Sequence, residues 1–274
     1  MKPAFDPIQD FELALCLTPG LGSTTIAKII TRNAISGLSA QDFFRLRREA
    51  LVEEYGLSER SAEALAAGDV LREHIADLKR RIGDKPVSIV TCGSPLYPRR
   101  VEEFGKNPPG FLVLYGNRRV LQARTFAAMA SREAEAGVLE KIERIVEKGV
   151  LEGKTLVAGT NTPSYQRAAV VPLRWGSPRI LPLDRGIFHV FGESLEDEAF
   201  PAARLWRHRF DPLTDLAVSP FRPDDDFAPG HNKTRDELVF ALSDEIHIVH
   251  QKQGGNMERL SQLAEKLGRK VVRL

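Results

Sequence analysis

From residue 85 onward, short apolar segments alternate with amphipathic segments of helical spacing. The apolar segments end in small or polar residues and read, in order, "PVSIVT", "PGFLVLYG", "TFAAMAS", "KTLVAG", "RILPL", "LAVSPF", "EIHIVH" and "KVVRL". The spacing of apolar residues predicts helices between several of them, at 133–149, about 163–174, about 195–209, 231–243 and 255–267. Strands that alternate with helices favour an α/β fold, with a mainly parallel sheet and helices on both faces.

The first part of the chain has a different pattern of apolar residues. Residues 8–83 are predicted to be all helix, because apolar residues recur there at spacings of three and four. We therefore predict a small helical domain at residues 1–84 and a Rossmann-like domain at residues 85–274. The segment "SPFRPDDDFAPGHNK", rich in Pro and Asp, is predicted to be an exposed loop.

Two segments of the helical domain have the form of a helix-hairpin-helix. These are "LTPGLGSTTIAKII" (17–30) and a weaker second copy, "YGLSERSAEAL" (55–65). Glycines in such a turn offer backbone N–H groups at a helix start to a DNA phosphate. Hairpins of this kind also serve as plain packing units, and a local net charge of −2 does not attract DNA, so both interpretations stay open at this point.

Composition and charge limit the function classes. The 274 residues are 42% hydrophobic and 28% charged with a net charge of +2, as in an ordinary globular protein. Residues 1–84 carry 11 Lys and Arg against 13 Asp and Glu, which leaves +4 for the remainder and permits a phosphate-binding groove there. No run of 18 apolar residues occurs and the N-terminal segment is acidic, so we expect a cytoplasmic protein that does not span or bind a membrane. Two distant cysteines predict buried free thiols.

Polar and basic residues follow three of the predicted strands. Ser131 and Arg132 come after the strand at 125–129, Gly159, Thr160 and Asn161 follow "KTLVA", and Gly254, Gly255 and Asn256 follow "EIHIVH". Asn232, Lys233 and Arg235 stand at or near the start of the helix at 231–243, where cations are locally unfavourable unless an anion offsets them. Arg132 is unfavourable in the same way, although a solvated Arg beside two glutamates explains it equally well. Ser131 either caps its helix or donates to an anion, and Arg167 faces either the crevice or solvent.

The position of these residues predicts a binding site. The carboxyl ends of parallel strands meet at one edge of the sheet, where open α/β sheets bind ligands. We expect a phosphate-bearing ligand at this edge, held by the cations and by backbone N–H groups.

Several catalytic and cofactor motifs are missing. The sequence has no G-x-G-x-x-G followed by an acidic residue, no G-x-x-x-x-G-K-[ST] and no G-x-S-x-G. The six histidines show no metal-ligand spacing. We therefore expect no dinucleotide cofactor, no metal and no enzymatic activity.

The order of motifs resembles the DprA/Smf DNA-processing proteins over most of the chain. "CGSPLYPRRVEEFGKNPPGFLVLYGN" (92–117) is similar to the family's entry segment, and "TFAAMASREAEAG" to its strand and G-S-R turn. "DELVFALSDEIHIVHQKQGGNMERL" resembles the family's R-N-R helix, LSD, strand and S-G-S turn. The R-N-R itself aligns either to Arg235-Asp236-Glu237 or, with a gap, to His231-Asn232-Lys233.

The resemblance implies a non-enzymatic protein that binds single-stranded DNA at the carboxyl edge, forms a homodimer and loads DNA onto RecA in natural transformation or recombination. The chain departs from the family at Ala130, which replaces the Gly of G-S-R, and at Thr162 and Tyr165, where an Arg and an Asp are lost. An alternative is a module of a stress or phage-defence system that senses a nucleotide or nucleotide-derived signal. A nucleotide phosphoribohydrolase is disfavoured, because the expected catalytic Glu is replaced by Ser261.

Overall fold

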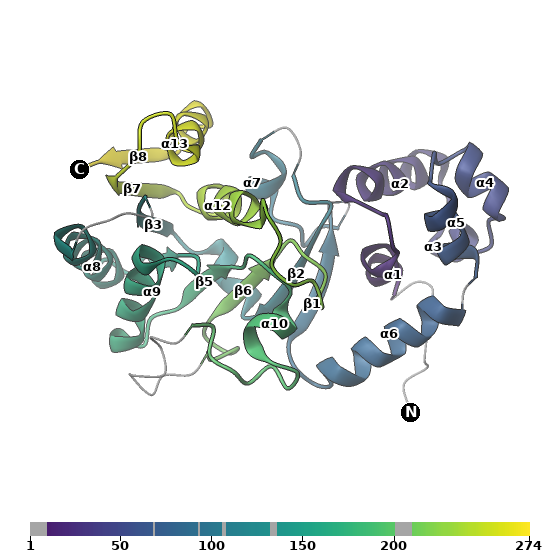
Figure 1. Cartoon of the computed structure of the whole chain (residues 1–274), viewed down its shortest axis with the longest axis horizontal. Helices are drawn as coiled ribbons and strands as arrows, with labels where there is room; N and C mark the ends of the chain where they lie inside the picture. The colour runs from purple at the N-terminus through teal and green to yellow at the C-terminus, as the bar shows by residue number, and fades with distance from the viewer. Residues whose placement is uncertain (1–9, 68, 93, 106–107, 132–135, 201–209) are drawn as a thin grey trace. The chain divides into compact units, whose positions relative to one another are not determined.

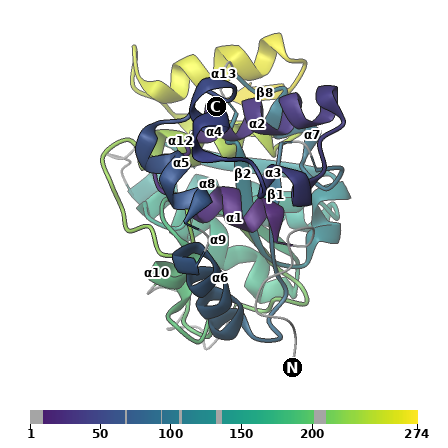
Figure 2. The same cartoon turned by 90° about the vertical axis from the view of Figure 1, so that its right-hand side faces the viewer.

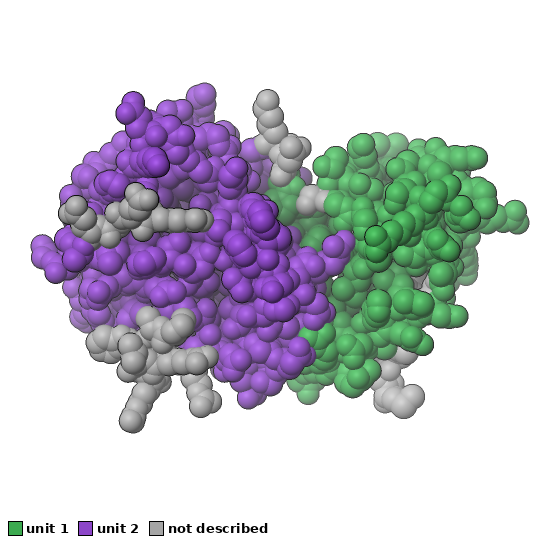
Figure 3. All heavy atoms as spheres, viewed as in Figure 1, with its two compact units in different colours: residues 1–84, 89–97, 107–112 green, residues 85–88, 98–106, 113–274 purple. Residues whose placement is uncertain are grey.

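The structure is a computed structural model of the whole chain. It describes residues 10–67, 69–92, 94–105, 108–131, 136–200 and 210–274. The chain forms two compact units, coloured separately in Figure 3. Unit 1 contains residues 1–84, 89–97 and 107–112, and unit 2 contains 85–88, 98–106 and 113–274. The segments 89–97 and 107–112 thus join the helical unit, whereas the sequence analysis placed them in the second domain.

Unit 1 is built from helices up to residue 84. They are α1 (Phe11–Leu17), α2 (Ser23–Ser36), α3 (Ala40–Phe43), α4 (Arg48–Glu53), α5 (Glu59–Ala66) and α6 (Asp69–Ile82). α1 packs against α6, and α4 against α5. Edge-to-face contacts of Phe43 with Phe11, Phe44 and Tyr55 stabilise the middle of the unit.

The strands form one eight-stranded sheet in the order β1-β2-β6-β5-β4-β3-β7-β8. β1 and β2 carry residues of both units. The strands are β1 (Val87–Thr91), β2 (Phe111–Gly116), β3 (Thr125–Ala130), β4 (Thr155–Val157), β5 (Arg179–Pro182), β6 (Leu216–Ser219), β7 (Glu245–His250) and β8 (Lys270–Arg273). The strands β3 to β8 pair in parallel, and β2 pairs antiparallel with β6. Every residue of β2, β3, β4, β5 and β6 is buried, as expected for strands covered on both faces.

Helices of unit 2 cover both faces of the parallel strands (Figure 1). They are α7 (Arg99–Glu102), the 3₁₀ helix η1 (Arg118–Gln122), α8 (Ala136–Leu151), α9 (Pro163–Trp175), α10 (Ile187–Phe191), α12 (His231–Ala241) and α13 (Asn256–Lys266). From β3 the chain runs through α8 and α9 to β4 and β5, and through α12 it crosses back to β7 on the other side of β3. Because parallel crossovers are right-handed, this reversal puts α8 and α9 on one face and α12 and α13 on the other. α13 lies beside β8 at the edge of the sheet (Figures 1 and 2).

The predicted α/β class with a preceding helical region is confirmed. One predicted helix is wrong at its start: residues 195–200 of the expected helix 195–209 form turns and bends, and the rest of it lies outside the described residues. Leu195 has a positive φ of 55°, outside the right-handed helical region, so the predicted helix does not begin there. Among the described residues, no helix combines the length and apolar character needed to cross a bilayer.

Candidate nucleic-acid interface

The order in which the parallel strands are added to the sheet reverses at β3, and this reversal marks one edge of the sheet. β4, β5 and β6 follow β3 on one side, and β7 and β8 lie on the other. Ligands of open α/β sheets bind at such a switch point, outside the carboxyl ends of the strands. We call this region the carboxyl edge, and define it as residue 131, residues 158–162, 183–186 and 250–256, and the first turn of α12 at 230–235.

Ser131 joins the loops after the two strands that flank the switch point. Its backbone N–H donates to the carbonyl oxygen of His250 over 2.9 Å. Its hydroxyl oxygen accepts from the backbone N–H of Lys252, also over 2.9 Å. The pairing register of β3 and β7 shifts between Met129 and Ala130, so the strand pairing is irregular just before Ser131. Ser131 therefore fixes the bend after β7 against the end of β3.

Two backbone donors of the Gly254–Asn256 bend already have acceptors. The N–H of Gly254 donates to the Glu258 carboxylate over 2.6 Å, and the N–H of Gly255 donates to the carbonyl of Lys252 over 3.2 Å. Asn256 begins α13, and its Oδ1 accepts from Arg259 over 3.0 Å. A carboxylate thus occupies the position for which the sequence analysis predicted a phosphate.

Arg235 is enclosed at the start of α12. It is 1% exposed. Its Nε donates to Asp236 Oδ1 over 2.9 Å, its Nη2 to Asn232 Oδ1 over 3.3 Å, and its Nη1 to Asn161 Oδ1. The guanidinium carbon lies 4.7 Å from the centre of the Tyr165 ring. A buried cation needs such compensation, so Arg235 acts in this structure as a bridge between α12 and the loop after β4.

Two neighbours complete the surroundings of Arg235. A Cβ atom at Gly159 would lie 2.7 Å from Arg235 Nη1 and 2.9 Å from the Tyr165 ring, so a glycine is needed there for the guanidinium to fit. The Tyr165 hydroxyl donates to Asp236 Oδ1 over 2.9 Å. Burial, and the nearby Asp236 carboxylate, raise the pKa of Tyr165 well above its usual value, so the phenol stays neutral.

Asn161 connects three segments of the carboxyl edge. Its amide nitrogen donates to Asn232 Oδ1 over 2.6 Å and to the carboxylate of Asp184 after β5. Asp184 is 2% exposed and also accepts from Arg185 Nε over 3.1 Å. Thr160 is buried, and its carbonyl accepts from Gln166 over 2.9 Å. The predicted residues Gly159, Asn161, Asn232 and Arg235 therefore do come together, in a network whose polar groups largely satisfy each other.

The other predicted cations lie in different environments. Lys233 is exposed on the first turn of α12 and makes no ion pair with the described residues. Arg167 is directed to α8, where it pairs with Glu143 over 3.4 Å, away from the Arg235 network. Arg132 lies outside the described residues.

Three contributors to this edge are not among the site residues predicted from the sequence. Asp184 and Asp236 supply the carboxylates, and Lys252 supplies an exposed lysine that makes no ion pair within the described part of the chain. Asp184 follows the predicted strand "RILPL", and Lys252 stands two residues before the glycine pair, so a search of every strand end would have found both. Among the described residues, no group of His, Cys, Asp or Glu at this edge has the geometry of a metal site.

The predicted hairpins in unit 1 are helix–turn–helix elements. Thr18–Gly22 joins α1 to α2, and the hydroxyl of Ser61 on α5 donates to the carbonyl of Pro19 over 2.9 Å. A Cβ at Gly20, whose φ is +79°, would lie 2.7 Å from Ser61 Oγ. The first turn is thus packed on the second hairpin, which is the packing role that the sequence analysis weighed against contact with DNA.

A family model and two solved structures are similar to this chain. The model described as DNA recombination-mediator protein A matches residues 88–274. The X-ray structure of DNA processing protein A (DprA) from Streptococcus pneumoniae is 17% identical with a TM-score of 0.73, and the match covers 97% of this chain and 86% of that one. DNA processing protein A from Helicobacter pylori, described by its single-stranded DNA binding mode, is 16% identical with a TM-score of 0.53, covering 69% and 81%. At these identities the two structures show a shared fold. No curated protein matches the sequence.

Proposed function

The chain belongs to the DNA recombination-mediator protein A family, and on that premise we propose that it binds single-stranded DNA at the carboxyl edge and acts in DNA processing and recombination. The observation that carries the proposal is the family match over residues 88–274, which spans the parallel sheet and all of the carboxyl edge. The described binding of single-stranded DNA by the Helicobacter pylori protein supplies the ligand class.

The charges at the edge support a ligand that is bound through its backbone. Lys233 and Lys252 are exposed and make no ion pair with described residues, so they are available to phosphates without breaking an internal contact. Arg235 and Asp236 are committed to each other. We therefore assign phosphate contacts to Lys233 and Lys252. Arg235, Asn161 and Asn232 then position the first turn of α12 for this contact, and Ser131 positions the bend that carries Lys252.

This assignment predicts weak sequence preference and strong salt dependence. Two lysines that contact a phosphate chain release counterions on binding, and do not read base edges. Aromatic side chains at the described edge are engaged elsewhere: Tyr165 stacks on Arg235, and Phe221 stacks on His231 at 3.8 Å between ring centres. Base stacking on these rings would need rearrangement, so the phosphates dominate the expected affinity.

The test is fluorescence polarisation of labelled oligo-dT over a salt series. The slope of log K against log salt changes by about 0.7 for each phosphate contact with a single strand. Lys233→Ala and Lys252→Ala should each flatten the slope by about that amount, and the double variant by about twice as much. Lys141→Ala is the matched control, because Lys141 is an exposed lysine on α8.

Two outcomes would contradict the proposal. No binding of oligo-dT at low salt would remove the DNA ligand altogether. Equal slopes for Lys141→Ala and the two edge variants would place DNA binding elsewhere. If AMP but not oligo-dT protected the protein against thermal unfolding, and Lys233→Ala abolished that protection, the edge would instead be a nucleotide sensor.

Recombination places further requirements on the protein. As parts of the same proposal, the protein forms a homodimer in the cytoplasm and delivers single-stranded DNA to a RecA-type recombinase, as the family description of a recombination mediator suggests. Sedimentation velocity at micromolar concentration tests the dimer. Strand exchange by RecA on DNA covered with single-strand binding protein tests delivery, and the double lysine variant should lose any stimulation.

A further inference from the structure

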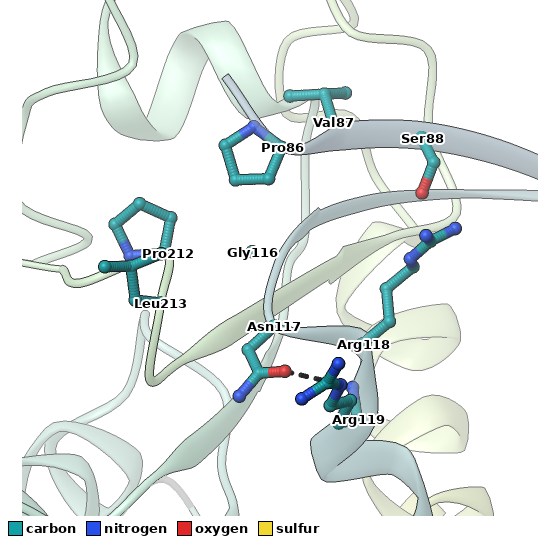
Figure 4. Close-up of a pocket in the computed structure, with 9 residues that line it drawn as sticks. All are labelled: Pro86, Val87, Ser88, Gly116, Asn117, Arg118, Arg119, Pro212 and Leu213. Carbon is teal, nitrogen blue, oxygen red and sulfur yellow. Dashed lines mark hydrogen bonds between the residues drawn. The ribbon is translucent and has the colours of Figure 1, made fainter. Parts of the chain in front are cut away.

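A second polar site lies at the opposite edge of the sheet, where β5 and β6 begin and β2 ends. A pocket of about 450 Å³ opens there, lined by Pro86, Val87, Ser88, Gly116, Asn117, Arg118, Arg119, Pro212 and Leu213 (Figure 4). All nine residues belong to unit 2. The volume is within the range of about 300 to 1,000 Å³ of pockets that enclose small organic ligands.

Backbone hydrogen bonds hold the walls of the pocket in place. The N–H of Gly116 donates to the carbonyl of Pro86 over 2.9 Å, and the N–H of Asn117 donates to the carbonyl of Asp215 over 2.8 Å. Gly116 has a φ of +114°, and a Cβ there would lie 2.2 Å from the Asp215 carbonyl oxygen. The third wall is fixed by Asp211, whose carboxylate accepts from the N–H of Leu213 over 2.9 Å. The pocket is therefore preformed.

The polar groups of the pocket have unused donors. Arg118 and Arg119 are exposed, and their guanidinium groups form no ion pair or hydrogen bond with the described residues. Asn117 turns its Oδ1 to the backbone N–H of Arg119 over 3.1 Å, which keeps the 3₁₀ helix capped. The hydroxyl of Ser88 is buried and has no hydrogen-bond partner. In Figure 4 the Arg118 side chain extends toward Ser88, and Arg119 lies beside Asn117.

Among the described residues, the lining contains no acidic side chain to balance these cations. Other arginines of unit 2 do have a carboxylate partner. Arg179 forms an ion pair with Asp215, and Arg100 forms one with Asp244. Two adjacent guanidinium groups that are unpaired among the described residues favour a bound anion with several acceptor oxygens. The opposite wall is apolar and rigid, with two proline rings and Leu213, which is 82% exposed at the mouth.

We propose that this pocket binds a small organic phosphate of mononucleotide size, with the phosphate held by Arg118 and Arg119 and the apolar body of the ligand against Pro86, Pro212 and Leu213. A phosphate offers oxygens to two guanidinium forks at once. A planar base covers apolar wall without needing further hydrogen bonds. The site is separate from the carboxyl edge and does not depend on DNA binding there.

Isothermal titration calorimetry with AMP as the probe tests this site on the full chain. The double variant Arg118→Ala/Arg119→Ala should weaken AMP binding at least 10-fold. Leu213→Asp should weaken it several-fold, because it puts a carboxylate at the mouth without disturbing a buried residue. Arg60→Ala, at an exposed arginine of unit 1, is the matched control.

The remaining arms can overturn the proposal. The proposal is wrong if AMP at millimolar concentration gives no heat of binding. It is also wrong if the Arg118→Ala/Arg119→Ala variant binds AMP with the same affinity as the wild type. Equal binding of adenosine would exclude the phosphate contact, and equal binding of inorganic phosphate would exclude the apolar contact. If the double variant lost oligo-dT binding and AMP did not bind, the pocket would belong to the path of DNA. Loss of oligo-dT binding in the lysine variants alone leaves this site unaffected, so the two proposals fail separately.

Discussion

The two edges of the parallel sheet use their charged residues differently. At the amino edge, where the strands begin, cations are held in ion pairs: Arg179 with Asp215, Arg100 with Asp244, and Lys154 with Glu245 over 2.9 Å. At the carboxyl edge, Lys233 and Lys252 are exposed and unpaired with described residues, and the enclosed Arg235 holds the first turn of α12, which carries Lys233.

This difference separates structural cations from cations that can serve a ligand. A paired, buried cation stabilises the fold only while its partner is present, and its N–H groups are not available to a ligand. An exposed, unpaired one contributes little to stability and is free to bind an anion. Arg118 and Arg119 are exceptions at the amino edge, which is why we infer a second site there.

The largest effect is expected at the Arg179–Asp215 pair. Both residues are 2% exposed, and Arg179 Nε lies 3.2 Å from each carboxylate oxygen of Asp215. Asp215→Ala leaves a buried guanidinium without its counter-charge, so the free energy of unfolding should fall by about 3 to 5 kcal/mol. Urea denaturation followed by circular dichroism measures the loss.

Two variants complete that test. Glu140→Ala breaks an exposed pair with Arg144 on α8 and should cost less than about 1 kcal/mol. The double variant Arg179→Met/Asp215→Leu removes both charges and should recover part of the stability. If Asp215→Ala were no more destabilising than Glu140→Ala, the pair would not be the structural element that we describe.

A smaller effect is expected from Gly159→Ala at the carboxyl edge. The added Cβ would lie within 3 Å of both Arg235 and Tyr165, and such overpacking typically costs about 1 to 3 kcal/mol. Because the Arg235 network positions α12, the same variant should also weaken oligo-dT binding. Gly137→Ala in α8 is the control, since nothing lies within 4 Å of its Cβ and alanine favours the helix. A neutral Gly159→Ala would mean that Arg235 is free to move.

Tyr165→Phe should have a still smaller effect. It removes the 2.9 Å hydrogen bond to Asp236 but keeps the ring beneath the Arg235 guanidinium. A net loss of about 0.5 to 1.5 kcal/mol is expected from one neutral donor. Tyr165→Leu, which also removes the ring, should cost more. Equal losses in the two variants, measured by thermal unfolding, would show that the stacking contributes nothing.

The sequence predicts the fold well because its signals are local. Buried strands appear as apolar runs, and helices show their periodicity, so all eight strands were predicted near their observed positions. The segment 195–200 was missed because its apolar spacing fits a helix, whereas Leu195 adopts a positive φ. No local sequence pattern predicts a positive φ at a leucine.

The site was predicted less completely, because pairing between distant residues decides what each side chain does. The sequence brings Asn161, Asn232 and Arg235 to the correct edge, but it does not show that they bond to one another. Glu258 at the Gly254 amide is a similar case, since its position one turn into α13 suggests solvent exposure. The sequence also cannot show that Arg118 and Arg119 lack ion-pair partners among the described residues, because this depends on where the neighbouring carboxylates lie in the folded protein.

The smallest and most specific effect concerns pH. Burial alone would raise the pKa of Glu245, but hydrogen bonds from Lys154 and Lys270 outweigh it and lower the pKa from 4.5 to about 2. A depressed pKa in the folded state means that the contribution of Glu245 to stability is present above about pH 4.5 and is lost as the pH falls toward 2. In Glu245→Gln this contribution is absent, so the difference in free energy of unfolding between wild type and variant should shrink from pH 6 to pH 3. Glu102→Gln, at an exposed residue, is the control variant. If the difference in free energy of unfolding stayed constant with pH, the Lys154–Glu245 ion pair would not contribute to the stability of the amino edge.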